Sequence, residues 1–110
     1  MPLTKEEILE ALRNVYDPEI PVDIVNLGLI YDVHVGEGVV RVKMTTTASG
    51  CPVGNLIAAE ARKAIGKLAE TRCVLARHES MPEIEVELVD DPPWDEARVS
   101  EDGRRMLGWR

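Results

Sequence analysis

The chain has 110 residues, a formal net charge of −7 and only two cysteines. This length suits one small domain, 1–110, and the negative charge argues against nucleic acid as a partner, because a phosphate backbone needs a basic surface. No apolar run approaches the roughly 20 residues that cross a bilayer, so no membrane partner is expected. The N-terminus lacks a signal-peptide pattern, and two cysteines cannot build a disulfide framework, so we expect a cytoplasmic protein.

The first predicted element is a helix that starts after Thr4. Thr4 and Glu7 match a capping box, in which each residue's side chain bonds to the other's backbone amide. Apolar residues then recur at helical spacing: Ile8, Leu9, Leu12 and Val15. The pattern is expected to end at Tyr16–Asp17, because a residue that precedes proline is pushed out of helical geometry.

A proline-flanked acidic loop follows, reading D-P-E-I-P-V-D over residues 17–23. Its two prolines restrict the backbone, so the carboxylates between them are held rather than free. We interpret Asp23 as an ordinary turn cap, and Asp17 with Glu19 as a positioned pair. The sequence alone does not place this pair relative to any other group.

Next comes a predicted hairpin. One strand covers 29–35, a glycine-bearing loop covers 36–38, and the return strand runs from Val39 to about Thr46. On the return strand we expect Val40, Val42 and Met44 on one face, and Arg41, Lys43 and Thr45 on the other. His34 falls on the polar face of the first strand, where we read it as an ordinary exposed residue.

The stretch 45–54, T-T-T-A-S-G-C-P-V-G, joins this hairpin to a long helical pattern. Proline is favoured at the first helical position, so Cys51 is expected at the N-cap. There the free backbone amides and the positive end of the helix dipole would lower the thiol pKa. A buried structural cysteine is the alternative. Because Ser49, Gly50 and Pro52 are poor core residues, we favour a reactive thiol.

The helix after Cys51 is predicted to reach at least Leu68. The helical spacing predicts an apolar face made of Val53, Leu56, Ile57, Ala61, Ala64, Ile65 and Leu68. The segment 69–80 fits either a helical continuation or a loop with a short strand. We interpret Cys73 as a semi-buried spectator, and His78 as a spectator too.

The last third of the chain contains a strand, a stiff turn and a short helix. Alternation over 83–88 predicts a strand with one acidic face, joined to the hairpin by a crossover through the long helix. The turn 90–95 carries Trp94, which must pack or meet a partner. Ser100 is expected to cap a final helix through Leu107, which Gly103 would weaken. Together these elements predict an α+β, two-layer sandwich, a mixed sheet of about three strands with helices on one face.

Four motifs arrive in a characteristic order over nearly the whole chain. They are V-Y-D-P-E-I (15–20), N-L-G-L-I-Y-D-V (26–33), M-T-T-T-A-S-G-C-P (44–52) and D-P-P-W (91–94). In this order the chain resembles the SufT/PaaD-like family of iron–sulfur cluster assembly factors, also catalogued as domain of unknown function fifty-nine and related to the eukaryotic cytosolic iron–sulfur targeting subunit. The resemblance implies that the acidic loop and the T-x-T-x-x-G-C-P motif converge. The implied site comprises Asp17, Glu19, Thr45, Thr47 and Cys51.

The chain departs from the family pattern in three places. Asp90 stands where the last motif usually has a first tryptophan, the segment 70–80 is longer than usual, and the cysteine-bearing C-terminal region of true PaaD proteins is missing. The first two departures concern local geometry. The third favours a general assembly factor over one dedicated to aromatic-ring oxygenases.

The resemblance implies a maturation factor that works through Cys51, with assembly proteins and client apo-proteins as partners and an iron–sulfur cluster or iron as transient cargo. Cluster irons are held mainly by thiolates, typically about four per cluster. With one well-placed thiol, the chain could pool two copies of Cys51 in a homodimer, or act as an adaptor that binds no cluster. Two further readings stay open: a thiol-dependent enzyme with Cys51 as nucleophile, and a plain protein-interaction module built around Trp94.

Overall fold

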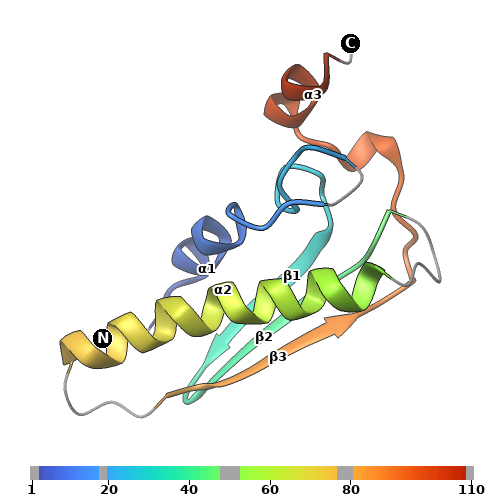
Figure 1. The fold of residues 1–110 in the computed structure, drawn as a ribbon. Coiled ribbons are helices and arrows are strands. Elements are labelled where there is room, and N and C mark those ends of the chain that lie inside the picture. Colours follow the sequence, from blue (N-terminus) through green and yellow to red (C-terminus); the bar gives the residue numbers. More distant parts are fainter. Residues whose placement is uncertain (1–2, 18–19, 48–52, 77–80, 109–110) are drawn as a thin grey trace.

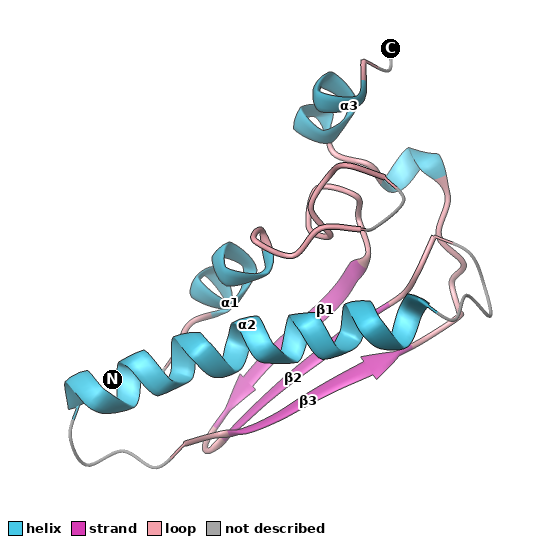
Figure 2. Cartoon of the chain, in the orientation of Figure 1, coloured by secondary structure: helices cyan, strands magenta, loops and turns pink. Residues whose placement is uncertain are grey.

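The computed structural model describes residues 3–17, 20–47, 53–76 and 81–108. Its elements are α1 (Lys5–Leu12), β1 (Ile30–Gly36), β2 (Val39–Met44), α2 (Val53–Ala76), β3 (Glu83–Leu88), the 3-10 helix η1 (Glu96–Arg98) and α3 (Glu101–Leu107). The strands form one sheet in the order β1–β2–β3, with β1 antiparallel and β3 parallel to β2. α1 and α2 pack against each other and cover one face of this sheet (Figures 1 and 2). The predicted α+β class is confirmed.

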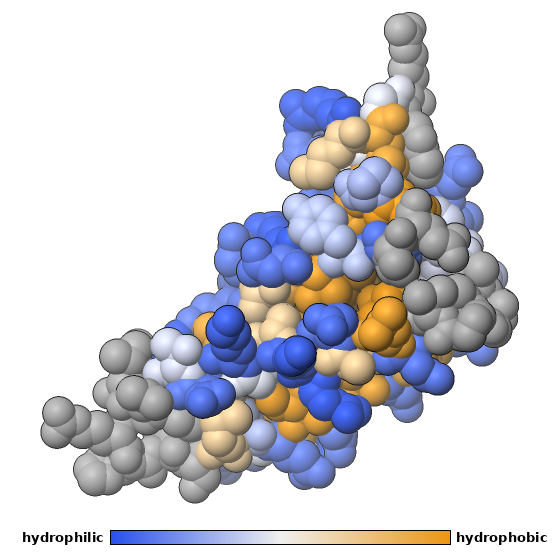
Figure 3. Space-filling model, in the orientation of Figure 1, coloured by the Kyte–Doolittle hydropathy of each residue, from blue (hydrophilic) through white to orange (hydrophobic). Residues whose placement is uncertain are grey.

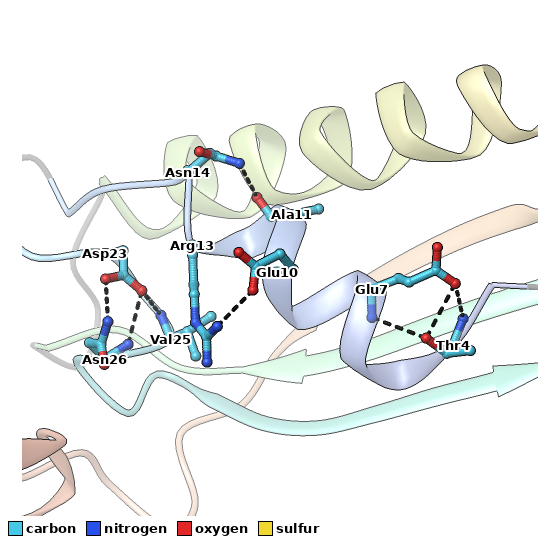
Figure 4. Close-up of polar contacts among 9 residues, drawn as sticks. All are labelled: Thr4, Glu7, Glu10, Ala11, Arg13, Asn14, Asp23, Val25 and Asn26. Carbon is cyan, nitrogen blue, oxygen red and sulfur yellow. Dashed lines mark hydrogen bonds and ion pairs between the residues drawn. The ribbon is translucent and has the colours of Figure 1, made fainter. Parts of the chain in front are cut away.

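α1 begins as the sequence predicts. Thr4 is its N-cap, and the Thr4 hydroxyl accepts from the Glu7 amide at 3.1 Å while the Glu7 carboxylate accepts from the Thr4 amide at 3.2 Å (Figure 4). Both halves of the capping box are therefore made. Ile8 and Leu12 point from this helix into the core, where both are fully buried.

The prediction that this helix reaches Tyr16–Asp17 is wrong, because it ends at Leu12. Tighter turns follow, in which the amide of Asn14 bonds to the carbonyl of Ala11 at 3.2 Å and the amide of Val15 bonds to that of Leu12 at 3.0 Å. These turns keep Val15 in the core. They also release the backbone to pair with a later segment, which the helical spacing of apolar residues could not reveal.

The hairpin forms, and the expected alternation holds from Asp32 onward, after a register shift between Ile30 and Asp32. Val33 of β1 lies opposite Val42 of β2 and both are buried, whereas His34 and its partner Arg41 are exposed. Gly38 supplies the turn with a φ of 72°, a backbone region that side chains disfavour. His34 is thus an exposed residue of the open sheet face, as predicted.

α2 is longer than the minimum that the sequence predicts, since it continues to Ala76. Its buried residues recur at helical spacing as Ile57, Ala61, Ile65 and Ala69. Leu56 was predicted on the same apolar face, but it is 55% exposed. Leu56 lies about 100° around the helix from Ile57, which is 3% exposed, so it falls at the edge of the buried face. Cys73 falls within α2, and its side chain, like His78, lies outside the described residues.

The C-terminal segment returns to the start of β1. Trp94, half-buried against the core, donates its indole N–H to the carbonyl oxygen of Leu27 at 2.6 Å. The Tyr31 hydroxyl donates to the carbonyl oxygen of Pro92 at 2.7 Å, and the Arg98 guanidinium stacks 4.6 Å from the Tyr31 ring centroid. These contacts hold residues 92–98 against the turn 24–28.

α3 is capped by Ser100 as predicted, the Ser100 hydroxyl accepting from the Gly103 amide at 3.0 Å. Gly103 was predicted to weaken this helix. The structure adds a packing role, because a Cβ on Gly103 would lie 2.8 Å from a Val99 methyl group and 3.1 Å from the Asn26 carbonyl oxygen. Within the described residues, no helix is both long and apolar enough to span a membrane.

Candidate functional site

The acidic loop is closed at its base by backbone pairing. Tyr16 and Asp23 form an isolated antiparallel bridge, and the amide of Ile24 donates to the carbonyl of Val15 at 2.9 Å. Inside this base, the amide of Asp17 donates to the carbonyl of Val22 at 3.3 Å. The loop therefore leaves and re-enters the fold at one point, which fixes where its carboxylates can lie.

Asp17 is the described carboxylate of the predicted pair. It is only 5% exposed, and its Oδ1 accepts from the amide of Ile20 at 3.0 Å. A buried carboxylate is tolerated where hydrogen bonds replace lost water, and the loop backbone supplies one here. The predicted partner, Glu19, lies outside the described residues. The pairing of Asp17 with Glu19 stays a prediction.

Asp23 is the turn cap that the sequence predicts. One of its oxygens accepts from the amides of Val25 and Asn26 at 3.1 and 3.0 Å, and the other accepts from the Asn26 side-chain amide at 2.6 Å (Figure 4). Asp23 as a whole is 3% exposed, and both of its carboxylate oxygens are bonded within the turn. We assign Asp23 no part in binding a ligand.

A short path of backbone hydrogen bonds links the acidic loop to the end of β2. The amide of Leu29 donates to the carbonyl of Ile24, at the loop's base, at 3.1 Å. The carbonyl of Leu29 in turn accepts from the amide of Thr45 at 2.9 Å. The acidic loop and the residue that opens the T-T-T-A-S-G-C-P stretch therefore lie at the same end of the fold (Figure 1).

The alternation predicts Thr45 on the polar face of the return strand, and this prediction is wrong. β2 ends at Met44, and Thr45 is 3% exposed. Because the Thr45 amide turns toward Leu29, the period-2 pattern of the strand no longer applies beyond Met44. Thr47, two residues further on, is half-buried. Of the two threonines in the predicted site, Thr45 is buried at the end of the sheet.

Cys51 lies outside the described residues. The prediction that it caps the long helix and carries a reactive thiol is therefore still a prediction. The described part of α2 begins at Val53, the second residue after Cys51 in the sequence. The ends of β2 and α2 that flank the undescribed segment 48–52 lie at the same end of the sheet as the start of β1 (Figure 1).

Two exposed apolar side chains neighbour these motifs in the sequence. Tyr16, directly before Asp17, is 58% exposed, and Leu56, five residues after Cys51, is 55% exposed. On the face seen in Figure 3, apolar residues reach the surface in the middle of the molecule and are flanked by hydrophilic ones. Apolar groups beside a polar site are typical of a surface that meets another protein.

His34, the histidine among the described residues, lies away from the end of β2 that leads toward Cys51. His34 lies opposite Arg41, four residues before Thr45, or about 13 Å along the strand. It is exposed on the open face of the sheet. Among the described residues, no group of three histidine, cysteine, aspartate or glutamate side chains is arranged to hold a metal ion.

The sequence did not reveal that Asn26 connects the turn after the acidic loop to the start of the last helix. Asn26 was read only as part of a turn, yet its side-chain Oδ1 accepts from the Ser100 hydroxyl at 2.6 Å. The two residues are 74 positions apart, so no local pattern could have paired them.

The family model described as "Iron-sulfur cluster assembly protein" matches residues 5–75. The chain is 41% identical to the Fe-S protein maturation auxiliary factor YitW of Bacillus subtilis, covering 94% of this chain and 93% of the relative. It is 40% identical to the Fe-S protein maturation auxiliary factor SufT of Staphylococcus aureus, over 86% and 97% of the two chains. A crystal structure of a domain of unknown function from Bacillus anthracis superposes with a TM-score of 0.76 at 36% identity, over 96% and 92%.

Proposed function

The chain belongs to the iron–sulfur cluster assembly protein family, and from this membership we propose that it is a maturation factor for iron–sulfur proteins. We further propose that it works through Cys51, beside the acidic loop of Asp17 and Glu19, with Thr45 and Thr47 positioning the chain between them. Its partners are then iron–sulfur assembly proteins and client apo-proteins.

One structural observation supports this site above the others. The hydrogen bonds Ile24–Leu29 and Leu29–Thr45 tie the base of the acidic loop to the residue that leads toward Cys51. Ile24, which directly follows the acidic loop, and Thr45, which opens the second motif, are thereby bonded to the amide and the carbonyl of one residue, Leu29. A shared anchor of this kind suits a site built from both motifs.

The chemistry of the side chains limits what such a site can do. A single thiolate supplies one of the roughly four ligands that a cluster needs. Cys51 would therefore hold cluster or iron only as cargo shared with another chain, either a second copy or a carrier or client. Carboxylates prefer to bind harder ions than thiolates do, so Asp17 and Glu19 would assist iron rather than complete a sulfur-ligated cluster.

The exposed apolar residues Tyr16 and Leu56 fit this shared arrangement. Each borders one of the two motifs in sequence, and each leaves a large side chain in water that a docking partner could cover. A protein that only passes cargo needs such transient contact, because its partner must also leave. The proposal thus assigns the exposed side chains to partner contact and the thiol to the cargo.

The test compares Cys51→Ser with Cys73→Ser, a matched loss of one thiol in α2. Each variant is assayed for maturation of an iron–sulfur client enzyme, and each is reconstituted anaerobically with iron and sulfide while iron-dependent absorbance is followed. We expect Cys73→Ser to retain both signals and Cys51→Ser to lose maturation. If wild-type protein gives no absorbance yet maturation depends on Cys51, the adaptor form holds. Full maturation by Cys51→Ser overturns the proposal.

A further inference from the structure

Asn26 uses every polar atom it has to join three segments of the chain. Its backbone N–H and side-chain Nδ2 donate to the two carboxylate oxygens of Asp23, at 3.0 and 2.6 Å. Its side-chain Oδ1 accepts from the Ser100 hydroxyl at 2.6 Å, and its carbonyl oxygen accepts from the Ser100 amide at 2.7 Å. Two bonds therefore run toward the acidic loop and two toward α3.

Both partners of Asn26 are themselves fixed. Asp23 is 3% exposed and pairs with Tyr16 at the base of the acidic loop. Ser100 is the N-cap of α3, where its hydroxyl also accepts from the Gly103 amide at 3.0 Å. A displacement of Asn26 would therefore disturb the hydrogen bonds at the base of the acidic loop and those at the N-cap of α3.

An amide side chain satisfies both neighbours at any pH. The Asp23 carboxylate only accepts hydrogen bonds, so the group facing it must donate, while the Ser100 hydroxyl, whose oxygen already accepts from Gly103, donates to its other neighbour. Asparagine presents a donor and an acceptor at this reach. Aspartate would place a second carboxylate against Asp23, and alanine would leave both polar neighbours without that partner.

We propose that Asn26 is a positioning residue for the acidic loop: it transmits the fixed position of the C-terminal segment to the carboxylate of Asp17. Only the expected effect on client maturation rests on the proposed function, since the order of the loop can be measured without a client protein. The C-terminal segment is in turn held by Trp94 on Leu27 and by Arg98 against Tyr31, so the position it transmits is well defined.

The close approach at Gly28 supports the same role. A Cβ there would lie 2.3 Å from the Arg98 carbonyl oxygen, and the backbone has a φ of 79°. The backbone of the turn 24–28 therefore contacts the backbone of the C-terminal segment at Arg98, and no side chain lies between the two. Such contact leaves little freedom for the turn to shift relative to that segment.

The first experiment is native-state hydrogen exchange at the amides of Ile20 and Val22. The Ile20 amide donates to Asp17 Oδ1 at 3.0 Å, so its protection reports directly on the loop's carboxylate. Asn26→Ala is compared with Thr4→Ala, which removes a cap of similar worth at the other end of the fold. We expect Asn26→Ala to lower protection of these amides by about tenfold or more, the loss of a charged hydrogen bond, and Thr4→Ala to leave the ratio between these amides and the core unchanged.

A second variant separates positioning from general loss of stability. In Asn26→Asp two carboxylates face each other, and both cannot be charged without repulsion. We expect loop protection in this variant to be near wild type at low pH, where one carboxyl keeps its proton, and to fall as pH rises. Compared at each pH with Thr4→Ala, the deficit in loop protection should therefore grow as pH rises, because the proton that the two carboxyl groups share is then lost.

Client maturation then distinguishes the two proposals. Lower loop protection together with lower maturation in Asn26→Ala supports both. Lower protection with unchanged maturation supports the positioning role and contradicts the proposed use of the loop. Unchanged loop protection in Asn26→Ala, or a pH-independent deficit in Asn26→Asp, overturns the positioning role whatever the maturation result.

Discussion

The indole N–H of Trp94 bonds to the carbonyl oxygen of Leu27 at 2.6 Å, across 67 positions of sequence. Leu27 is fully buried, so without this donor its carbonyl would lose a partner in a place that water does not reach freely. Trp94 therefore stabilises the turn 24–28 by packing against the core and bonding to Leu27, and it is not a fully exposed aromatic residue.

Replacing Trp94 by phenylalanine should therefore destabilise the fold while keeping most of the aromatic packing. We expect a loss of about 1 kcal/mol in the free energy of unfolding, the usual net worth of a hydrogen bond. Urea unfolding followed by circular dichroism measures it, with an unchanged m-value. The control is Tyr31→Phe, which removes a more exposed bond to Pro92 and should cost less than about 0.5 kcal/mol. Equal losses for both variants would contradict the assignment.

Gly66 in α2 and Gly103 in α3 should respond to alanine with opposite signs. Alanine generally stabilises a helix by up to about 1 kcal/mol relative to glycine. At Gly66 the new methyl group would meet only a terminal Ile84 carbon, at 3.8 Å, so we expect that gain. At Gly103 it would lie 2.8 Å from a Val99 methyl, and we expect a net loss of about 1–3 kcal/mol from overpacking. Thermal unfolding of both variants decides it, and a stabilised Gly103→Ala would disprove the close packing.

Asp17→Asn should impair maturation while the fold survives. The amide oxygen of asparagine can still accept from Ile20, so we expect a stability change within about 1 kcal/mol. Removal of the negative charge should lower client maturation by about tenfold or more, as loss of a supporting carboxylate does at metal sites. Glu10→Gln, which removes an exposed carboxylate on α1, is the control and should mature the client normally. Normal maturation by Asp17→Asn would remove Asp17 from the proposed site.

Cys51 should alkylate faster than Cys73 on the native protein. Cys73 lies three residues before the C-terminal end of α2, where the helix dipole disfavours a thiolate, whereas Cys51 is predicted at the start of that helix. We expect a rate ratio of about ten or more with iodoacetamide at pH 7, read by mass spectrometry of the two peptides. In urea the rates should converge, which shows that the difference belongs to the fold. Equal rates on the folded protein would count against an activated Cys51.

Much of the secondary structure follows from the sequence because its causes are local. The capping box of Thr4 and Glu7 involves neighbours three residues apart, and the alternation in β2 and in β1 from Asp32 onward follows directly from the pleat. The family resemblance likewise rests on motifs that can be read one at a time, and the family model confirms it. The site residues were proposed from the same motifs, and for Cys51 and Glu19 the proposal still rests on them alone.

By itself, the sequence determined the type and order of the main helices and strands, most of their apolar positions and the family that the chain resembles. Only the tertiary structure decided that Thr45 is buried, that the first helix stops at Leu12, that Leu56 is exposed and that Gly103 packs tightly. The physical reason is the same for each: the deciding contact comes from a distant segment, or from a competition between neighbours for one buried place. Asn26 is the clearest case, since its partner Ser100 is 74 residues away and no local sequence pattern around either residue predicts the hydrogen bond.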